Sequence, residues 1–432
     1  MDLTGLQATG TSPTHIRWHV VTFLAVIAGL TYIDRLNLGI VGQYVQEEFH
    51  FNNEVMGWIL GSFSLGYAIF HIPGGWLGDR FGPRIVLACA LLWWSVFTAA
   101  MAVAPRLWPL ALLGPAAALA TVRFLMGAGE AAAIPLGNKM MGYWLGENER
   151  ALGTSIFLAG VGAGGVVAPF FILWLMNYGG WRTPFLVCGV LGAVLAACWY
   201  SYVTNQPQQH RAVNAAELAM IGGGIAPSAQ ISYVPWQKLL SSKSIWGLMV
   251  SHFCLVYSVY IFFTWFFIYL IRVRGVTIVR ASFWGSAPFL ATIFLVPFWG
   301  WLSDRVVRQF GKRHGRQWIV WLGIACSAGL MWSGSQTRAN NIAFLQLAAA
   351  AGFNLGASAI LWTTCNDITK RFSGSVSGMM TTFGSLGGFL SPVLTGKIAT
   401  QMGWTAALGF AALVTLIGGL PWIFIDASKE VA

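Results

Sequence analysis

Long apolar stretches follow one another along almost the whole of this sequence. A helix that crosses a bilayer needs about 20 consecutive apolar residues, and the 432 residues hold roughly twelve stretches of that length. Backbone polar groups inside hydrocarbon must be satisfied within their own segment, so each stretch is predicted to be a helix. The predicted spans lie at 17–42, 54–77, 84–104, 115–141, 151–176, 182–203, 245–270, 281–303, 317–335, 341–366, 375–397 and 404–426.

The composition agrees with an all-α membrane protein. Only 9% of the residues are charged and 56% are hydrophobic, whereas about a quarter of the residues in soluble domains are charged. The net charge of +11 is not carried by basic clusters interleaved with aromatic residues, so no nucleic-acid partner is expected. The six cysteines all fall inside apolar stretches without CxxC spacing. We therefore expect neither disulfides nor a metal site, and no cofactor.

The distribution of basic residues predicts the orientation of the spans. It assigns the connections after the second, fourth, eighth and tenth spans to the cytoplasm, and an even number of spans then places both termini there. The absence of an Asn-x-Ser/Thr sequon favours a bacterial inner membrane. The basic residues of these connections are Arg80, Arg84, Lys139, Arg150, Arg305, Arg308, Lys312, Arg313, Arg316, Lys370 and Arg371.

The connections on the opposite side fit this orientation less uniformly. The first of them, from Gln43 to Asn53, holds two glutamates and no lysine or arginine. Arg272, Arg274 and Arg280 disagree, because they lie between the seventh and eighth spans on the predicted outer face. The charges of later loops influence the orientation less than those of the first loop, so the predicted orientation is unchanged.

An internal repeat divides the chain. The run GWLGDRFGPR, from Gly75 to Arg84, returns as GWLSDR at Gly300 to Arg305, 225 residues later. Such a repeat predicts two pseudo-symmetric six-helix bundles, at 1–203 and 244–432, joined by a cytoplasmic linker at 204–243. Charges cannot lie in hydrocarbon, so both runs are predicted to form gates at the membrane surface. The predicted gating residues are Gly75, Asp79, Arg80, Gly82, Arg84, Asp304 and Arg305.

Two further segments carry structural expectations. The linker is polar and glycine-rich, with a short surface helix expected around Asn214 to Met220. The fifth span holds a run of small residues at 160–165 followed by Pro169, which predicts close helix contact and a bend. That run fits either a moving interface or static packing.

Four charged residues lie inside predicted spans: Asp34 and Arg35 in the first, Arg123 and Glu130 in the fourth. Inserting each of these charges at the centre of a membrane helix costs about 2.5–3.5 kcal/mol, so we expect each to have an ion-pair partner or a functional role. Adjacent residues on a helix point about 100° apart, and therefore Asp34 and Arg35 cannot serve one face. The pairings are expected to cross between helices. The structural alternative is a salt-bridge network that only fixes helix register.

The formal charge of this quartet is zero, which predicts coupled transport. An organic anion that enters makes the site negative, and protonation of one carboxylate restores neutrality. The planar arginine fork binds a carboxylate with two parallel hydrogen bonds. An anion on the arginines also removes the partner of the carboxylate, which then takes up a proton. Proton and anion would travel together.

A stripe on the seventh span is a second candidate site. Tyr257, Tyr260, Ile261, Thr264 and Trp265 recur at three- and four-residue steps and share one helical face. The stripe fits a cavity lining and plain helix packing equally well. The two histidines inside spans, at positions 71 and 252, are interpreted as packing residues and left out of the mechanism.

Several motifs resemble a known family. The run from Gly75 to Arg84 resembles the loop signature of the major facilitator superfamily, and Arg123-x-x-x-Gly127-x-Gly129 is similar to its fourth-helix motif. The runs YIDRLN at 32–37 and RFLMGAGE at 123–130 resemble the anion:cation symporter family. The runs FFTWF at 262–266 and SVSGMM at 375–380 resemble its bacterial sugar-acid and dicarboxylate members.

The resemblance implies proton-driven uptake of organic anions by alternating access. Carried over by position, it makes Arg35 and Arg123 the anion contacts and Asp34 and Glu130 the protonation sites. Thr381 and Ser385 of the eleventh span stand where relatives usually have asparagine. A hydroxyl has one donor where an amide has two, so the hydroxyl pattern of the recognised substrate should differ.

We therefore expect a monomeric secondary transporter, surrounded by lipid, that imports a sugar acid (hexonate, hexuronate or aldarate) with protons. An organic-anion exchanger or exporter and a non-transporting receptor are the alternatives. An enzyme is not expected, because no catalytic constellation can be placed in the polar segments. The predicted substrate contacts are Arg35, Arg123, Tyr32, Tyr260, Thr264, Trp265, Thr381 and Ser385.

Overall fold

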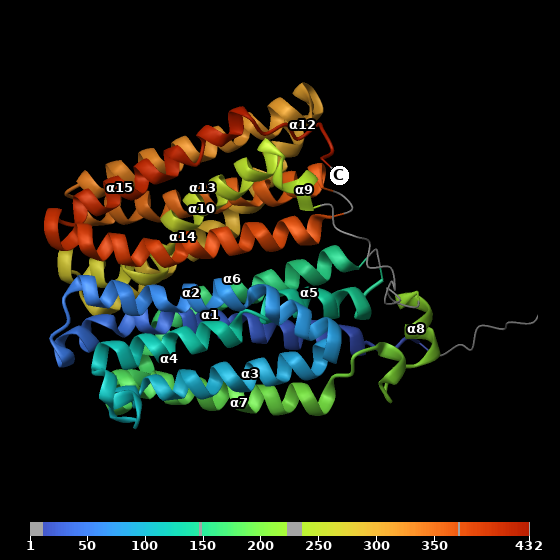
Figure 1. Ribbon diagram of the computed structural model, residues 1–432, viewed down its shortest axis with the longest axis horizontal. Coiled ribbons are helices and arrows are strands. Elements are labelled where there is room, and N and C mark those ends of the chain that lie inside the picture. The colour runs from blue at the N-terminus through green and yellow to red at the C-terminus, as the bar shows by residue number, and fades with distance from the viewer. Residues whose placement is uncertain (1–11, 147–148, 223–235, 370–371, 432) are drawn as a thin grey trace, which may run out of the picture.

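The computed structural model describes residues 12–146, 149–222, 236–369 and 372–431. Within these ranges all the regular structure is helical, and the long helices run roughly side by side (Figure 1). The first half of the chain forms α1 (Ile16–Phe49), α2 (Asn53–Phe81), α3 (Pro83–Met101), α4 (Pro115–Glu130), α5 (Ala133–Trp144), α6 (Arg150–Gly179) and α7 (Thr183–Tyr202).

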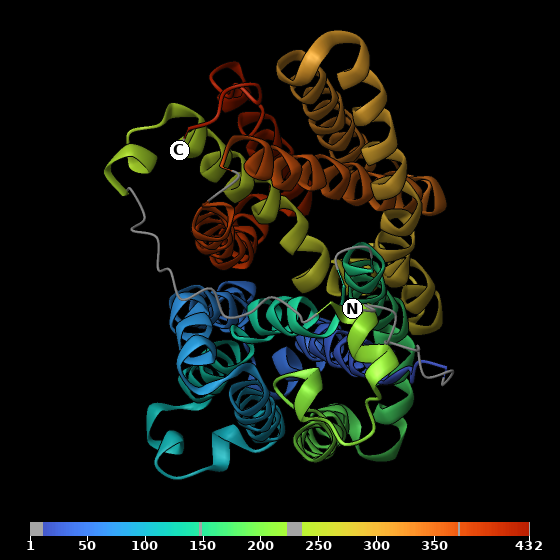
Figure 2. The same cartoon turned by 90° about the vertical axis from the view of Figure 1, so that its right-hand side faces the viewer.

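The second half repeats this arrangement. Seen end on, its helices form a group separate from α1–α7 (Figure 2). They are α10 (Lys243–Thr264), α11 (Phe266–Ile268), the π-helical turn η5 (Tyr269–Val273), α12 (Ile278–Gln336), α13 (Asn340–Ile368), α14 (Ser373–Met402), α15 (Trp404–Ile417) and the 3-10 turn η6 (Leu420–Ile423).

Nine helical segments among the described residues are long and apolar enough to cross a membrane. Two of these, Leu152–Tyr202 with 51 residues and Ile278–Gln336 with 59, exceed a single span. At 1.5 Å per residue each would be more than twice as long as the roughly 30 Å hydrocarbon layer is thick. The first is divided at Gly180 and the second at Gly311, both at positive φ. Counting each as two spans and adding α14 gives the predicted twelve, which confirms the fold class.

The repeated run ends in both halves at a turn that needs glycine. Gly82 has φ 87° and Gly311 has φ 76°, a region in which other residues are strained. They lie 229 residues apart, not 225, so the second connection is one helical turn longer. Asp79 pairs with Lys139 of α5 at 2.5 Å, and Asp304 pairs with Arg316 at 3.0 Å. The aspartate of the repeated run therefore pairs with a lysine in the first half and with an arginine in the second.

The other gating residues bind locally. The Arg80 guanidinium lies 5.5 Å from the Trp76 ring, and that of Arg305 lies 5.6 Å from the ring of Trp301. Arg84 donates to the carbonyl of Tyr200. Lys370 and Arg371 of the predicted cytoplasmic connections lie outside the described residues.

The small-residue run of the fifth span packs α6 against α1. A Cβ at Gly160 would stand 2.1 Å from the carbonyl oxygen of Ala25, so no larger residue fits without moving the helix. This contact joins two helices of one half, whereas Gly162 and Gly165 of the same run face Ile293 and Phe289 of α12 in the other half, so the run still fits both alternatives. Across the halves, α14 packs along α2 and α12 contacts α6.

The linker is described in part, since 223–235 lie outside the described residues. It forms α8 (Ala215–Ile221) and α9 (Trp236–Leu240), so the expected surface helix is present. Its Glu217 is fully buried and pairs with Arg17 at 3.0 Å, at the start of α1. Burial alone would raise the pKa of Glu217, but hydrogen bonds from Thr14 and Arg17 hold it below the usual value.

Candidate functional site

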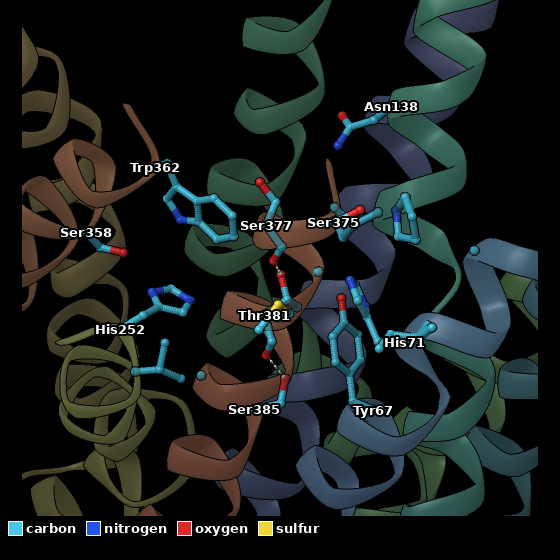
Figure 3. A pocket seen from close by; sticks show the side chains of 18 of the residues that line it. Tyr67, His71, Asn138, His252, Ser358, Trp362, Ser375, Ser377, Thr381 and Ser385 are labelled. Carbon is cyan, nitrogen blue, oxygen red and sulfur yellow. Dashed lines mark hydrogen bonds between the residues drawn. The ribbon is translucent and has the colours of Figure 1, made fainter. Parts of the chain in front are cut away.

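A cavity of about 870 Å³ lies between the two halves, within the 300–1,000 Å³ typical of small-molecule sites. Side chains of α1, α2 and α5 line one wall, and side chains of α10, α13 and α14 line the other (Figure 3). The lining reaches Gly75, Trp76 and Asp79 near the end of α2. The cavity therefore opens toward the end of the molecule that carries the repeated gate sequence.

One face of α2 supplies much of the first wall. Tyr67, His71, Gly75 and Asp79 lie at four-residue steps and all line the cavity, as residues on one helical face must. Of this face, only Gly75 and Asp79 were predicted from the sequence to have a function, as gating residues. Following the same period back from Asp79 would have found the other two.

Arg35 of α1 is the arginine that lines the cavity. Its Nε donates to Oε1 of Glu130 on α4 at 2.5 Å, so this pairing crosses between helices as predicted. The guanidinium lies 5.2 Å from the ring of Tyr32 and 4.8 Å from that of Tyr67. Aromatic faces stabilise the cation there. The bond to Glu130 uses one of five N–H donors, which leaves the fork available to a ligand.

Arg123 lies behind this site and does not line the cavity. Its side chain is 2% exposed, and Nη2 donates to the carbonyl of Arg35 at 2.9 Å. Nη1 lies 3.3 Å from the carbonyl of Asp34. In this conformation Arg123 donates to two backbone carbonyls of α1 and does not face the cavity.

Asp34 points away from the cavity. Its side chain is 1% exposed and neighbours Trp94 of α3 and Cys188 of α7. Neither carboxylate oxygen has a hydrogen-bond partner among the described residues, and no ion pair with Arg123 lies within 4 Å there. The quartet is thus divided into Arg35, which lines the cavity and is paired with the fully buried Glu130, and a second pair, Asp34 and Arg123, buried behind it.

The seventh-span stripe is divided as well. Tyr260 lines the cavity, as does Tyr32 of α1. Trp265 is fully buried and donates to the carbonyl of Pro392 at 3.1 Å, while Thr264 bonds to the carbonyl of Tyr260 at 2.7 Å. Of the predicted contacts on this span, Tyr260 lines this cavity, whereas Thr264 bonds within α10 and Trp265 bonds to α14.

Hydroxyls of α14 form the opposite wall. Ser377, Thr381 and Ser385 follow one another at four-residue steps along the lining (Figure 3). Thr381 donates to the carbonyl of Ser377 at 2.9 Å, and Ser385 donates to that of Thr381 at 2.8 Å. The predicted Thr381 and Ser385 therefore both face the cavity.

Both histidines interpreted as packing residues also line the cavity, one on each wall (Figure 3). The ring of His71 lies 5.4 Å from that of Tyr67. The ring of His252 meets Trp362 edge to face at 5.1 Å. Nδ1 of each ring is buried and has no partner among the described residues. No sequence pattern pointed to His252, because its place in the lining depends on where α13 and α14 pack.

The far end of the cavity is closed by contacts between the halves. Arg272 of η5 binds three groups near the end of α1: the carbonyl of Gln43 at 3.0 Å, Oε1 of Gln46 at 3.2 Å and the carboxylate of Glu47 at 3.0 Å. This contact explains one basic residue on the face that the positive-inside rule assigns to the outside. Arg274 instead bonds within its own half, to the carbonyls of Thr337 and Gly334.

Replacing Arg272 by alanine is expected to open this end more often. The Arg272 and Glu47 side chains are 34% and 63% exposed, and pairs that exposed contribute about 0–1 kcal/mol, so the shift in population should be up to about fivefold. A cysteine introduced at Gln43, in a background without the native cysteines, should react faster with an impermeant maleimide. Arg274→Ala is the matched control, and equal rates in the two variants would show that Arg272 does not hold this end closed.

Comparisons with known proteins agree with this architecture. A family model described as Major Facilitator Superfamily matches residues 24–392. A D-galactonate transporter of Escherichia coli O6:H1 is 29% identical over 433 residues, covering 97% of this chain and 98% of that protein. A probable galactarate/D-glucarate transporter of Bacillus subtilis is 29% identical over 431 residues, covering 95% of this chain and 92% of that protein.

Solved structures share the fold. The crystal structure of a bacterial homologue of the human lysosomal transporter Spinster, in an inward-facing and occupied conformation, superposes with a TM-score of 0.76. It is 18% identical and covers 96% of this chain and 97% of that chain. At this identity the likeness concerns the arrangement of helices.

Proposed function

This chain belongs to the Major Facilitator Superfamily, and from that premise we propose that it imports a sugar acid together with protons by alternating access. It is a membrane transporter and not an enzyme. The proposed location is a bacterial inner membrane, with both termini in the cytoplasm and the chain acting as a monomer. The proposed division is two bundles, at 1–203 and 244–432, with a linker at 204–243. In that orientation the cavity faces the cytoplasm.

The observation that carries the proposal is the arginine fork at the cavity wall. Arg35 is held by Glu130 at 2.5 Å and by two tyrosine rings, with donors left over for a carboxylate. Desolvated arginine keeps its charge and its geometry. A cavity with one such fork and a wall of hydroxyls suits a small acid that carries several hydroxyl groups.

Coupling follows from the same contact. A carboxylate that binds Arg35 competes with Glu130 for the guanidinium and adds a like charge beside it. Glu130 then loses its counter-charge in a fully buried position, which favours uptake of a proton. Release of the anion restores the Arg35–Glu130 pair and expels the proton. Arg35 is thus the proposed anion contact, and Glu130 the proposed proton site next to it.

The buried second pair acts on the same site from behind. Arg123 bonds the carbonyl of Arg35 at 2.9 Å, so its proposed role in this conformation is to position the anion-binding arginine. Asp34 remains a proposed second protonation site on the far face of α1.

The relatives support the choice of substrate. One transports D-galactonate and another is a probable galactarate/D-glucarate transporter. Galactonate, galactarate and glucarate are all hydroxylated six-carbon acids. We propose that this chain acts on the same chemical class.

Uptake of labelled sugar acids into proteoliposomes tests the proposal. An inward proton gradient should drive accumulation above the external concentration, and a protonophore should abolish it. Accumulation that is unaffected by the protonophore would contradict proton coupling. Counterflow alone would indicate an exchanger, and binding without any flux would indicate a receptor.

A further inference from the structure

The two walls of the cavity differ in fixed charge. The wall from the first half presents Arg35, whose guanidinium is shared with Glu130. The wall from the second half is built from α10, α13 and α14. Among the described residues that line this second wall there is no lysine or arginine. His252 lies there, but a histidine carries no permanent charge.

The hydroxyls on the second wall are oriented by their own helix. Thr381 and Ser385 donate their single hydrogens to carbonyls one turn earlier, at 2.9 and 2.8 Å. A hydroxyl whose hydrogen is used in this way presents lone pairs to the cavity. Such a surface accepts hydrogen bonds from a ligand and offers few in return.

A ligand hydroxyl and a ligand carboxylate therefore meet this wall differently. A hydroxyl can donate to Thr381 or Ser385, so a chain of hydroxyls is matched along α14. An ionised carboxylate only accepts hydrogen bonds. At the second wall it would lose its hydration and find no counter-ion, which is costly for a buried charge.

We propose, on the basis of the function proposed above, that the cavity selects a polyhydroxy acid with one carboxylate and rejects the dicarboxylate of the same carbon skeleton. The carboxylate lies at Arg35, and the hydroxyl chain extends across the cavity to Thr381 and Ser385. The distal hydroxyl then lies beside His252, which lines the same wall next to Trp362. Hexonates and hexuronates belong to the selected class, and aldarates do not.

Two pairs of acids test this directly in the wild-type chain. Galactonate and galactarate differ only at carbon 6, where a hydroxymethyl group is replaced by a carboxylate, and gluconate and glucarate form a second such pair. Each acid is titrated against the purified protein at pH 7.5, and its inhibition of labelled hexonate uptake is measured. In at least one pair the monocarboxylate should bind about tenfold more tightly or better.

The outcomes separate the two proposals. If the dicarboxylate of both pairs binds as tightly as its monocarboxylate, the selection is wrong while sugar-acid transport stands. If none of the four acids binds or is carried, the proposed function fails and the selection fails with it.

A charge added to the second wall gives an independent test. Thr381→Lys supplies the missing cation, so it should raise dicarboxylate affinity about tenfold relative to the monocarboxylate. Thr381→Met adds length without charge or hydrogen-bond donors, so it should not raise dicarboxylate affinity relative to the monocarboxylate. If Thr381→Lys binds the monocarboxylate but its affinity for the dicarboxylate does not rise, charge on this wall does not set the selection.

Discussion

Substituting lysine for Arg35 is expected to weaken binding of the transported acid by roughly 100-fold. The change keeps the charge but removes the planar fork, so two parallel hydrogen bonds to a carboxylate become one. A hydrogen bond to a charged group contributes about 1.5–3 kcal/mol, and about 1.4 kcal/mol corresponds to a factor of ten. The substitution also removes the Nε that holds Glu130 at 2.5 Å. Titration calorimetry on the purified protein measures the effect.

The matched control for this variant is Arg280→Lys. Arg280 is exposed and bonds Asn341 at 3.0 Å at the opposite end of the fold, so its substitution should leave affinity within about twofold. Both variants should elute as the wild type does in size-exclusion chromatography. Undiminished affinity in Arg35→Lys would show that the fork does not bind the anion.

Glu130→Gln is expected to abolish accumulation and to leave exchange in place. Glutamine has the shape of glutamate and can still accept the hydrogen bond from Arg35, but it cannot take up a proton. Without that proton the gradient cannot drive the anion. Accumulation in proteoliposomes under an inward proton gradient should therefore fall to the equilibrium ratio, a loss of tenfold or more wherever the wild type concentrates its substrate that much.

Counterflow in preloaded vesicles is the second measurement on the same variant. It needs binding and alternating access but no net proton movement, so its rate should stay within a few-fold of the wild type. Glu48→Gln is the control, because Glu48 pairs with Arg182 on the side away from the cavity and should change neither assay. Normal accumulation by Glu130→Gln would remove this residue from the proton path.

Helix periodicity accounts for much of what could be predicted. The separation of Asp34 and Arg35 onto different faces follows from the 100° step alone. In the structure Asp34 faces α3 and α7, and Arg35 lines the cavity. The four-residue steps on α2 work in the same way. Tyr67 and His71 could have been assigned from Asp79 by that rule, without coordinates.

The role of Arg123 could not be assigned without the tertiary structure. Its face on α4 was known, but whether that face meets the cavity or the back of α1 depends on where the two helices cross. The same holds for Trp265, whose stripe fitted both a cavity and packing. The position of α14 shows that Trp265 is a packing residue, because its indole nitrogen donates to the carbonyl of Pro392 on that helix at 3.1 Å.

The class, the number of spans, the repeat and the four buried charges follow from the amino-acid sequence alone, because hydrocarbon imposes strict costs on every residue it contains. Which of those charges lines the cavity, and which cavity wall has no lysine or arginine among its described residues, depends on how the helices pack. The reason is that a helical pattern fixes the direction of a side chain relative to its own axis. The neighbour that side chain meets is set by the packing of other helices, from segments far away in the chain.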